Sequence, residues 1–198
     1  MKEPYLDQIR TAVRQRYDAV ARSPRPLFQY PTGREGMLKL GYGEEFIDSL
    51  PASVAESFCG VGNPLLAGKI RPGETVLDVG CGAGVDIIRA AGLAGPDGKV
   101  YGVDLTSSMV ERAADNIKKM QIANAWAEEG AAESLPFPDK IFDVVTSNGV
   151  LNLSPEKRDW LGEIHRVLKP GGRLYLADMI LEDGMAGESP NNLDAWSA

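Results

Sequence analysis

The sequence is poor in the residues on which disulfide scaffolds, metal sites and histidine-based catalysis depend. It contains two cysteines, Cys59 and Cys81, which are too few for a disulfide framework, so we expect a reducing and therefore cytoplasmic environment. Its one histidine, His165, lies among charged neighbours on a predicted helix, which favours a surface position over a role as general base. We accordingly predict no metal site.

Long apolar runs and an excess of basic residues are absent as well. No stretch approaches the roughly 20 apolar residues that span a bilayer, and the N-terminus has no apolar signal-peptide region. The net charge of −7 argues against nucleic acid as the main partner. The 198 residues, 43% of them hydrophobic, suit one domain with a sizeable core. We predict a small-molecule protein with neither a membrane nor a nucleic-acid partner.

One segment combines a predicted strand, a glycine-rich turn and a helix. Residues 76–79 form a short apolar run typical of a buried strand, residues 80–84 read Gly-Cys-Gly-Ala-Gly, and a helical pattern begins at Val85. Asp104 ends a second predicted strand. Glycines at such a turn let a ligand approach the backbone, and a carboxylate at the neighbouring strand end can accept both hydroxyls of a ribose. This arrangement predicts a nucleoside-cofactor site.

The spacing of the glycines separates the candidate cofactors. A dinucleotide fingerprint needs a third glycine at position 85, where the chain has Val85, and Asp78 would repel a pyrophosphate. The same carboxylate suits a ligand that carries an ammonium and a sulfonium, which points to S-adenosylmethionine. No G-x-x-x-x-G-K-[ST] motif is present, which excludes a P-loop. A nicotinamide-dependent reductase and a plain structural turn stay open as alternatives.

Five ordered segments between residues 71 and 178 resemble the motifs of class I S-adenosylmethionine-dependent methyltransferases. The segments are 76–82, 103–104, 130–137, 142–148 and 168–174. The resemblance implies a Rossmann-like α/β fold and a methyl transfer from S-adenosylmethionine to a small molecule, with S-adenosylhomocysteine as product. It also implies the cofactor-binding residues Asp78, Gly80, Gly82, Asp104, Leu105, Met109, Ala132, Glu133, Asn148 and Val150. Many relatives carry Asp where Ala131 stands, which leaves the adenine amino group to Glu133 or to main chain.

Within that superfamily, segments 147–155 and 62–64 most resemble arsenite methyltransferases and their UbiE-like, type 11 relatives. That resemblance implies arsenic bound by cysteine thiolates, one of them at the position of Gly149. Because soft metalloids need several thiolates and Cys59 is the one candidate left, arsenite methylation is disfavoured. Candidate acceptor-side residues are Cys59, Asn63 and Tyr17. A buried apolar role for Cys59, a turn-capping role for Asn148 and a non-catalytic or truncated binding module stay open.

The hydrophobic pattern divides the chain into a helical cover or substrate lid over residues 1–70, a cofactor-binding core over 71–182 and a tail over 183–198. In the cover we expect a helix over 6–20, an irregular segment over 27–43 and a short helix over 44–50. In the core, Ser108 and Glu111 suggest a capping box. Ser154 and Pro155 predict the start of a helix that Gly171 ends, with Trp160, Leu161, Ile164 and Leu168 on its core face.

The same pattern predicts a mostly parallel sheet covered by helices on both faces. We expect five strands, at residues 75–80, 99–105, 125–129, 142–147 and 173–180, in the order 3-2-1-4-5. The last, apolar strand would then lie on an open edge, which is an aggregation liability. Relatives usually cover it with two further strands. We therefore expect missing C-terminal strands, or cover from another subunit in a homo-oligomer.

Overall fold

A computed structural model describes residues 3–22 and 27–180, and it contains one five-stranded parallel sheet. The strands are β1 (Thr75–Val79), β2 (Lys99–Asp104), β3 (Ala125–Glu129), β4 (Phe142–Asn148) and β5 (Leu168–Ala177), in the order β3-β2-β1-β4-β5. The predicted Rossmann-like α/β fold and the predicted strand order are confirmed. The predicted tail, residues 183–198, lies outside the described residues.

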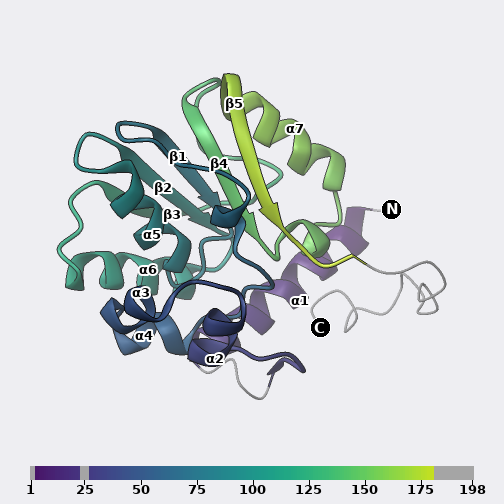
Figure 1. Cartoon of the computed structure of the whole chain (residues 1–198). Coiled ribbons are helices and arrows are strands. Elements are labelled where there is room, and N and C mark those ends of the chain that lie inside the picture. The colour runs from purple at the N-terminus through teal and green to yellow at the C-terminus, as the bar shows by residue number, and fades with distance from the viewer. Residues whose placement is uncertain (1–2, 23–26, 181–198) are drawn as a thin grey trace.

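Helices cover both faces of the sheet (Figure 1). Helices α5 (Val85–Ala94) and α6 (Ser107–Lys119) cover one face, and α7 (Lys157–Val167) covers the other. Because side chains alternate along a strand, Val76 of β1 packs in the cluster with α5 and α6, whereas Leu77 packs in the cluster with α7. The central strand is therefore buried on both sides, as its near-continuous apolar run predicts.

The N-terminal segment forms a helical cover at the carboxyl ends of the strands (Figure 1). It contains α1 (Glu3–Arg22), α2 (Gly33–Lys39), α3 (Glu44–Ser49), α4 (Ala52–Glu56) and a 3₁₀ turn, η2 (Pro64–Leu66). Val20 of α1 packs against Met109 of α6, which fixes this cover to the core. The prediction of an irregular segment over 27–43 was wrong in part, because α2 forms there around the fully buried Met37.

Two predicted starts of helices were wrong. Helix α6 has Thr106 as its N-cap residue, and Ser108 donates instead to Asp18 Oδ1 of α1 at 2.6 Å, so no Ser108–Glu111 capping box forms. Helix α7 begins at Lys157 rather than at Ser154. The Ser154 hydroxyl donates to the Glu133 carboxylate and accepts the Glu156 amide hydrogen, which ties it to the preceding loop.

The end of α7 and the start of the last strand also differ from the prediction. Helix α7 ends at Val167, and Leu168 already pairs with Phe142 as part of β5, so Gly171 lies within the strand rather than ending a helix. Pro170 cannot continue a helix, which is consistent with this early end. Leu161 was predicted in the core but is 46% exposed.

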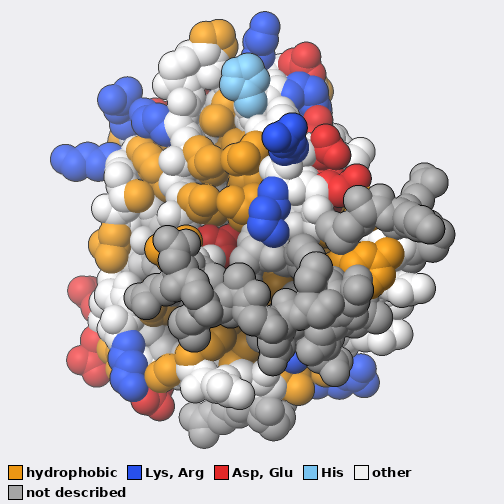
Figure 2. Space-filling view, turned by 90° about the vertical axis from the view of Figure 1, so that its right-hand side faces the viewer, with side chains coloured by type: hydrophobic (Ala, Val, Ile, Leu, Met, Phe, Trp, Pro, Cys, Tyr) orange, Lys and Arg blue, Asp and Glu red, His pale blue; other side chains and the backbone are white. Residues whose placement is uncertain are grey.

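Strand β5 pairs with β4, and no strand pairs with its outer edge within residues 3–22 and 27–180. Leu176, Met179 and Ile180 are 37%, 45% and 92% exposed. Figure 2 shows hydrophobic side chains gathered on the face of the molecule that carries this edge. None of the described helices is long and apolar enough to cross a membrane.

Candidate functional site

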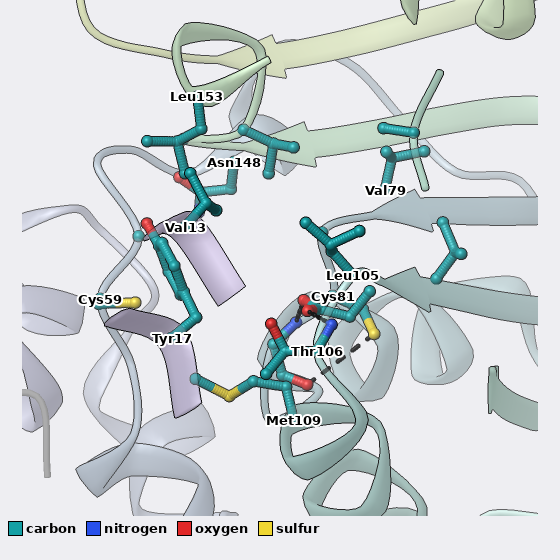
Figure 3. A pocket seen from close by; sticks show the side chains of 18 of the residues that line it. Val13, Tyr17, Cys59, Val79, Cys81, Leu105, Thr106, Met109, Asn148 and Leu153 are labelled. Carbon is teal, nitrogen blue, oxygen red and sulfur yellow. Dashed lines mark hydrogen bonds between the residues drawn. The ribbon is translucent and has the colours of Figure 1, made fainter. Parts of the chain in front are cut away.

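A cavity opens at the carboxyl ends of the central strands, where parallel α/β sheets place their ligands. One wall is built from the loop after β1 and the end of β2, with residues such as Val79, Cys81 and Leu105 (Figure 3). The opposite wall comes from the N-terminal cover and carries Val13 and Tyr17. The cavity therefore lies between the core and its cover.

The glycine loop holds its backbone close to the cavity. Gly80 has a φ of +76°, and a Cβ built there would overlap Val150, so both conformation and space require glycine. Gly82 has a φ of +51° and nothing within 4 Å of such a Cβ, which leaves room for a ligand against its main chain. The Gly80 and Cys81 amides both donate to Val103 O, at 2.7 and 3.0 Å, and this fixes the loop on β2.

Asp104 stands where the sequence predicts, at the end of β2 and facing the cavity. Its Oδ2 accepts the Gly82 amide hydrogen at 2.9 Å, and its Oδ1 accepts the Thr106 amide hydrogen at 3.0 Å. Burial raises the pKa of Asp104, and these two hydrogen bonds oppose the rise. The carboxylate is thus oriented by main chain on both sides and retains acceptor capacity toward the cavity.

The other predicted cofactor contacts divide into two groups. Leu105 and Met109 line the cavity beside Asp104, and Ala132 and Glu133 line it near the end of β3. Glu133 accepts the Ser154 hydroxyl, so part of its acceptor capacity is already used. These residues come together around one end of the cavity, as the motifs imply.

Asn148 and Val150 line the cavity at the end of β4. The Asn148 side chain is held by main chain on both of its polar atoms: Oδ1 accepts from the Val61 and Gly62 amides at 2.9 and 3.1 Å, and Nδ2 donates to Gly62 O at 2.8 Å. Asn148 therefore clamps the loop at residues 61–62 and does more than cap a turn.

Asp78 does not line the cavity, contrary to the sequence prediction. It is 2% exposed, and its Oδ1 accepts the Thr146 hydroxyl at 2.7 Å. Burial, with the nearby Asp86 carboxylate as the second cause, raises the pKa of Asp78 well above its ordinary value. Position in the motif predicts Asp78 near the ligand, whereas in the structure its carboxylate is bonded to Thr146 of the neighbouring strand β4 and lies outside the cavity lining.

Asp86 is the cavity-lining carboxylate that sequence reasoning missed. It lies in the first turn of α5, and it accepts the Tyr42 hydroxyl on Oδ1 at 2.8 Å and Asn148 Nδ2 on Oδ2 at 3.3 Å. Burial raises the pKa of Asp86 to about 6, and the two hydrogen bonds oppose that rise. The sequence does carry a sign of this role, because Asp86 is an acidic residue between two apolar residues, Val85 and Ile87, just after the glycine loop.

The three predicted acceptor-side residues do not lie together. Tyr17 and Cys59 line the cavity on the side of the N-terminal cover (Figure 3). Burial raises the pKa of Cys59 to about 12, so its thiol is protonated at neutral pH. Asn63 does not line the cavity, because its side chain accepts from the Leu65 amide at the start of η2 and donates to Gly41 O.

The predicted surface position of His165 is confirmed. His165 is exposed on α7, away from the cavity lining. Within the described part of the chain, no three His, Cys, Asp or Glu residues are grouped as a metal site would need. Two apolar residues that the motifs did not mark also line the cavity, Phe58 from the cover and Leu153 from the 3₁₀ turn after β4.

Comparisons with known proteins identify the family of this chain. A model of the methyltransferase domain family matches residues 70–197. The chain is 42% identical over 149 residues to an arsenite methyltransferase of Halobacterium salinarum, covering 75% of this chain and 38% of that protein. It is 38% identical over 106 residues to a demethylmenaquinone methyltransferase of Geobacillus sp., covering 54% of this chain and 45% of that protein. The chain thus spans less than half the length of these curated relatives.

Solved structures of methyltransferases have a similar fold. A SAM-dependent methyltransferase from Aquifex aeolicus matches with a TM-score of 0.57 and 30% identity, over 65% of this chain and 70% of that one. An arsenic (III) S-adenosylmethionine methyltransferase from Chlamydomonas reinhardtii matches with a TM-score of 0.61 and 34% identity, over 75% of this chain and 50% of that one. The family predicted from the sequence, with S-adenosylmethionine as its cofactor, is confirmed: this chain belongs to the methyltransferase domain family.

Proposed function

We propose that this chain binds S-adenosylmethionine in the cavity and transfers its methyl group to a small molecule. The observation that carries the proposal is the Asp104 carboxylate, which main-chain amides orient toward the cavity directly beside the open backbone at Gly82. A carboxylate in that place can accept the two hydroxyls of a ribose, while Leu105 and Met109 offer an apolar surface to adenine. Ala132 and Glu133 would border the adenine ring.

Asp86 takes the electrostatic role that the sequence analysis gave to Asp78. The methionine part of the donor carries an ammonium group, and Asp86 is the carboxylate that both lines the cavity and follows the glycine loop. A cation beside Asp86 stabilises the charged carboxylate, which burial otherwise disfavours. Asp78 then acts behind the loop, where its hydrogen bond to Thr146 joins β1 to β4.

For this reaction the protein mainly has to align the acceptor with the methyl group of the donor. The donor supplies a methyl group already activated by a sulfonium, so the nucleophile's lone pair forms the new bond as the carbon–sulfur bond breaks. Holding a nucleophile in line behind that carbon can lower the barrier by ~7–11 kcal/mol. The wall formed by Val13, Tyr17, Phe58, Cys59 and Leu153 would hold the acceptor there and exclude water. Asn148 and Val150 border this end of the cavity.

The character of that wall favours an uncharged, largely apolar organic acceptor. These five side chains are neutral, and the one cation among the described residues that line the cavity, Arg10 of α1, is paired with Glu156. Burial keeps both Tyr17 and Cys59 protonated. No described side chain at this end is poised as a general base, so the acceptor would bring its own reactive lone pair. The demethylmenaquinone methyltransferases among the relatives are named for an acceptor of organic type.

Arsenite is the second candidate acceptor, favoured by the 42% identity to an arsenite methyltransferase. The described residues supply little to bind it. Cys59 and Cys81 are the two thiols of the chain, and burial raises the pKa of both. Gly149 has a φ of +73°, where a cysteine would be strained. A trivalent metalloid needs several thiolates, so this acceptor would require ligands beyond these residues.

Two measurements test the proposed function. Isothermal titration calorimetry should detect binding of S-adenosylhomocysteine and none of NAD, whereas the reverse result would identify a nicotinamide enzyme. Incubation with methyl-labelled donor and a panel of thiol, amine, hydroxyl and metalloid acceptors should then label an organic acceptor. Donor binding without transfer to any acceptor would identify a non-catalytic binding module instead.

A further inference from the structure

Three side chains from distant parts of the chain meet beside the cavity, which two of them, Asp86 and Asn148, line. Tyr42 lies between α2 and α3, Asp86 in the first turn of α5, and Asn148 at the end of β4. The Tyr42 hydroxyl lies 2.8 Å from Asp86 Oδ1 and 3.1 Å from Asn148 Nδ2. Asn148 Nδ2 in turn lies 3.3 Å from Asp86 Oδ2. Asn148 Nδ2 has two N–H groups for three acceptors, since it also donates to Gly62 O at 2.8 Å, so its contact with Asp86 Oδ2 is the weakest of the cluster.

The direction of each hydrogen bond follows from the donors available. The Asn148 amide nitrogen can only donate, so the Tyr42 hydroxyl oxygen accepts a hydrogen bond from it. The hydroxyl proton of Tyr42 is then available for a second partner, which must be an acceptor. That acceptor is Asp86 Oδ1, because the alternative, Gly62 O, is farther from the hydroxyl at 3.2 Å and already accepts from Asn148 at 2.8 Å. Tyr42 therefore donates its one hydroxyl proton to the carboxylate.

Tyr42 does not itself reach the cavity. It is 4% exposed, it is absent from the cavity lining, and its ring packs edge-on against Phe58 with 5.3 Å between ring centroids. Burial and the Asp86 charge raise the pKa of Tyr42 well above its ordinary value, so the hydroxyl stays a donor at any physiological pH. Any effect of this hydroxyl on a ligand must pass through Asp86 or Asn148.

We infer that Tyr42 is a positioning residue for the ammonium end of the methyl donor. This inference rests on the proposed function, in which Asp86 faces that ammonium group. The hydroxyl of Tyr42 holds Asp86 Oδ1 in place, while Oδ2, which has only the long contact to Asn148 Nδ2 at 3.3 Å, keeps acceptor capacity for a cation in the cavity that Asp86 lines. It also stabilises the charged form of Asp86, which is the form that attracts a cation.

The same cluster connects the donor end of the cavity to its acceptor wall. Asn148 Oδ1 accepts the Val61 and Gly62 amides, which lie two and three residues beyond Cys59 in the chain. From outside the cavity lining, Tyr42 thus contacts two residues that line it, through a hydroxyl bond to the Asp86 carboxylate and a ring contact with Phe58 of the cover. Loss of its hydroxyl should act on the donor's charged end first, because the ring contact with Phe58 survives in phenylalanine.

The test compares two ligands that differ at the charged end. S-adenosylhomocysteine carries the ammonium group, and 5′-deoxy-5′-methylthioadenosine carries the same nucleoside and a sulfur but no ammonium. Calorimetry on Tyr42→Phe should show about tenfold weaker binding of S-adenosylhomocysteine, the loss expected for one hydrogen bond to a charged group. Binding of methylthioadenosine should stay within about twofold of the unsubstituted protein.

A matched control is Tyr175→Phe, which also removes one buried hydroxyl bond, that to Lys69 O at 3.1 Å, but lies outside the cavity lining. It should leave both affinities unchanged. Asp86→Asn should weaken S-adenosylhomocysteine selectively, and adding Tyr42→Phe to it should cost little more, since both act through one carboxylate. Thermal unfolding verifies that each variant is folded.

Two results would overturn the inference: Tyr42→Phe binding S-adenosylhomocysteine as tightly as the unsubstituted protein, or weakening both ligands equally. A full second loss in the double variant would also contradict it. Failure of the proposed function looks different, because then the unsubstituted protein itself does not bind S-adenosylhomocysteine.

Discussion

Asp78 and Asp86 form a pair of buried carboxylates whose charges are costly in the unliganded protein. They are 2% and 5% exposed, and burial raises the pKa of both. Near neutral pH the fold must hold negative charge in a place where water cannot solvate it. A cationic ligand at the cavity would offset that cost. The two carboxylates therefore lower the stability of the unliganded protein and at the same time attract a positively charged donor.

Asp86→Asn should stabilise the unliganded protein, and more so at high pH. The pKa of Asp86 is about 6 in the folded protein and ~3.9 in the unfolded chain. The protonated carboxyl therefore contributes its full share to the free energy of unfolding below pH ~3.9, and this contribution is lost as the pH rises through about 6. Asparagine carries no charge to bury. We expect a gain of about 1–2 kcal/mol at pH 8, or a Tm roughly 2–8 °C higher, and a smaller gain at pH 5.

Thermal unfolding at the two pH values checks this, with the exposed Asp115→Asn as control. The control should leave Tm within about 1 °C, as expected for a surface substitution. A lower Tm for Asp86→Asn at pH 8 than for the unsubstituted protein would show that the charged carboxylate is well stabilised without a ligand.

The individual site residues differ in how far the sequence determines them. Asp104, Gly80 and Gly82 follow from strand, turn and spacing, because those features fix the backbone that places them. The structure leaves Asp78 outside the cavity lining, since a motif gives the order of residues but not the face of the strand from which a side chain projects. Asp86 was missed because its hydrogen-bond partner Tyr42 lies 44 positions away, and no local pattern reveals such a contact.

Helix α1 shows what periodicity alone can and cannot predict. The recurrence of apolar residues predicts the helix, and the structure places Val13 and Tyr17 over the cavity. Its orientation depends on links to separate core segments, from Asp18 to Ser108 of α6 and from Arg10 to Glu156 before α7. Those links join residues 90 and 146 positions apart, so they cannot be read from local sequence.

Strand β5 leads to a prediction about association. Its outer edge has no paired strand among the described residues, and Leu176, Met179 and Ile180 are exposed beside it. Bare apolar edges promote pairing with other chains, and lysine on an edge discourages it. We expect this chain to associate in a concentration-dependent way and Leu176→Lys to reduce that association.

Sedimentation velocity over a range of concentrations measures the effect. Leu38→Lys, at a side chain on α2 that is 42% exposed, is the control and should associate like the unsubstituted protein. A chain that stays monomeric at every concentration would refute the expectation that β5 needs a cover.

The arrangement of the whole sheet was largely predictable, and the boundaries of its helices were not. Alternation of strands and helices predicts a parallel sheet covered on both faces, and the observed order β3-β2-β1-β4-β5 is the expected one, although no helix lies between β3 and β4. The start of α7 at Lys157 and the formation of α2 depend instead on the bond of Ser154 to Glu133 and on the burial of Met37. Such contacts join segments that only the folded chain brings together.

The charge of the molecule agrees with the nature of the proposed donor. The protein carries a net charge of −7, and its cavity is lined by three carboxylates, Asp86, Asp104 and Glu133. A donor with an ammonium and a sulfonium is attracted to such a cavity, whereas a dinucleotide brings two negative phosphates to it. The central claim is that one of these carboxylates, Asp104, binds the ribose of the donor.

Calorimetric titration of Asp104→Ala with S-adenosylhomocysteine tests that claim most directly. Glu128→Ala, which removes an exposed carboxylate on the neighbouring strand β3, serves as control, and thermal unfolding verifies that both variants fold. Loss of a charged acceptor from two ribose hydroxyls should weaken binding at least about tenfold, while the control binds normally. Unchanged affinity in Asp104→Ala would contradict the account.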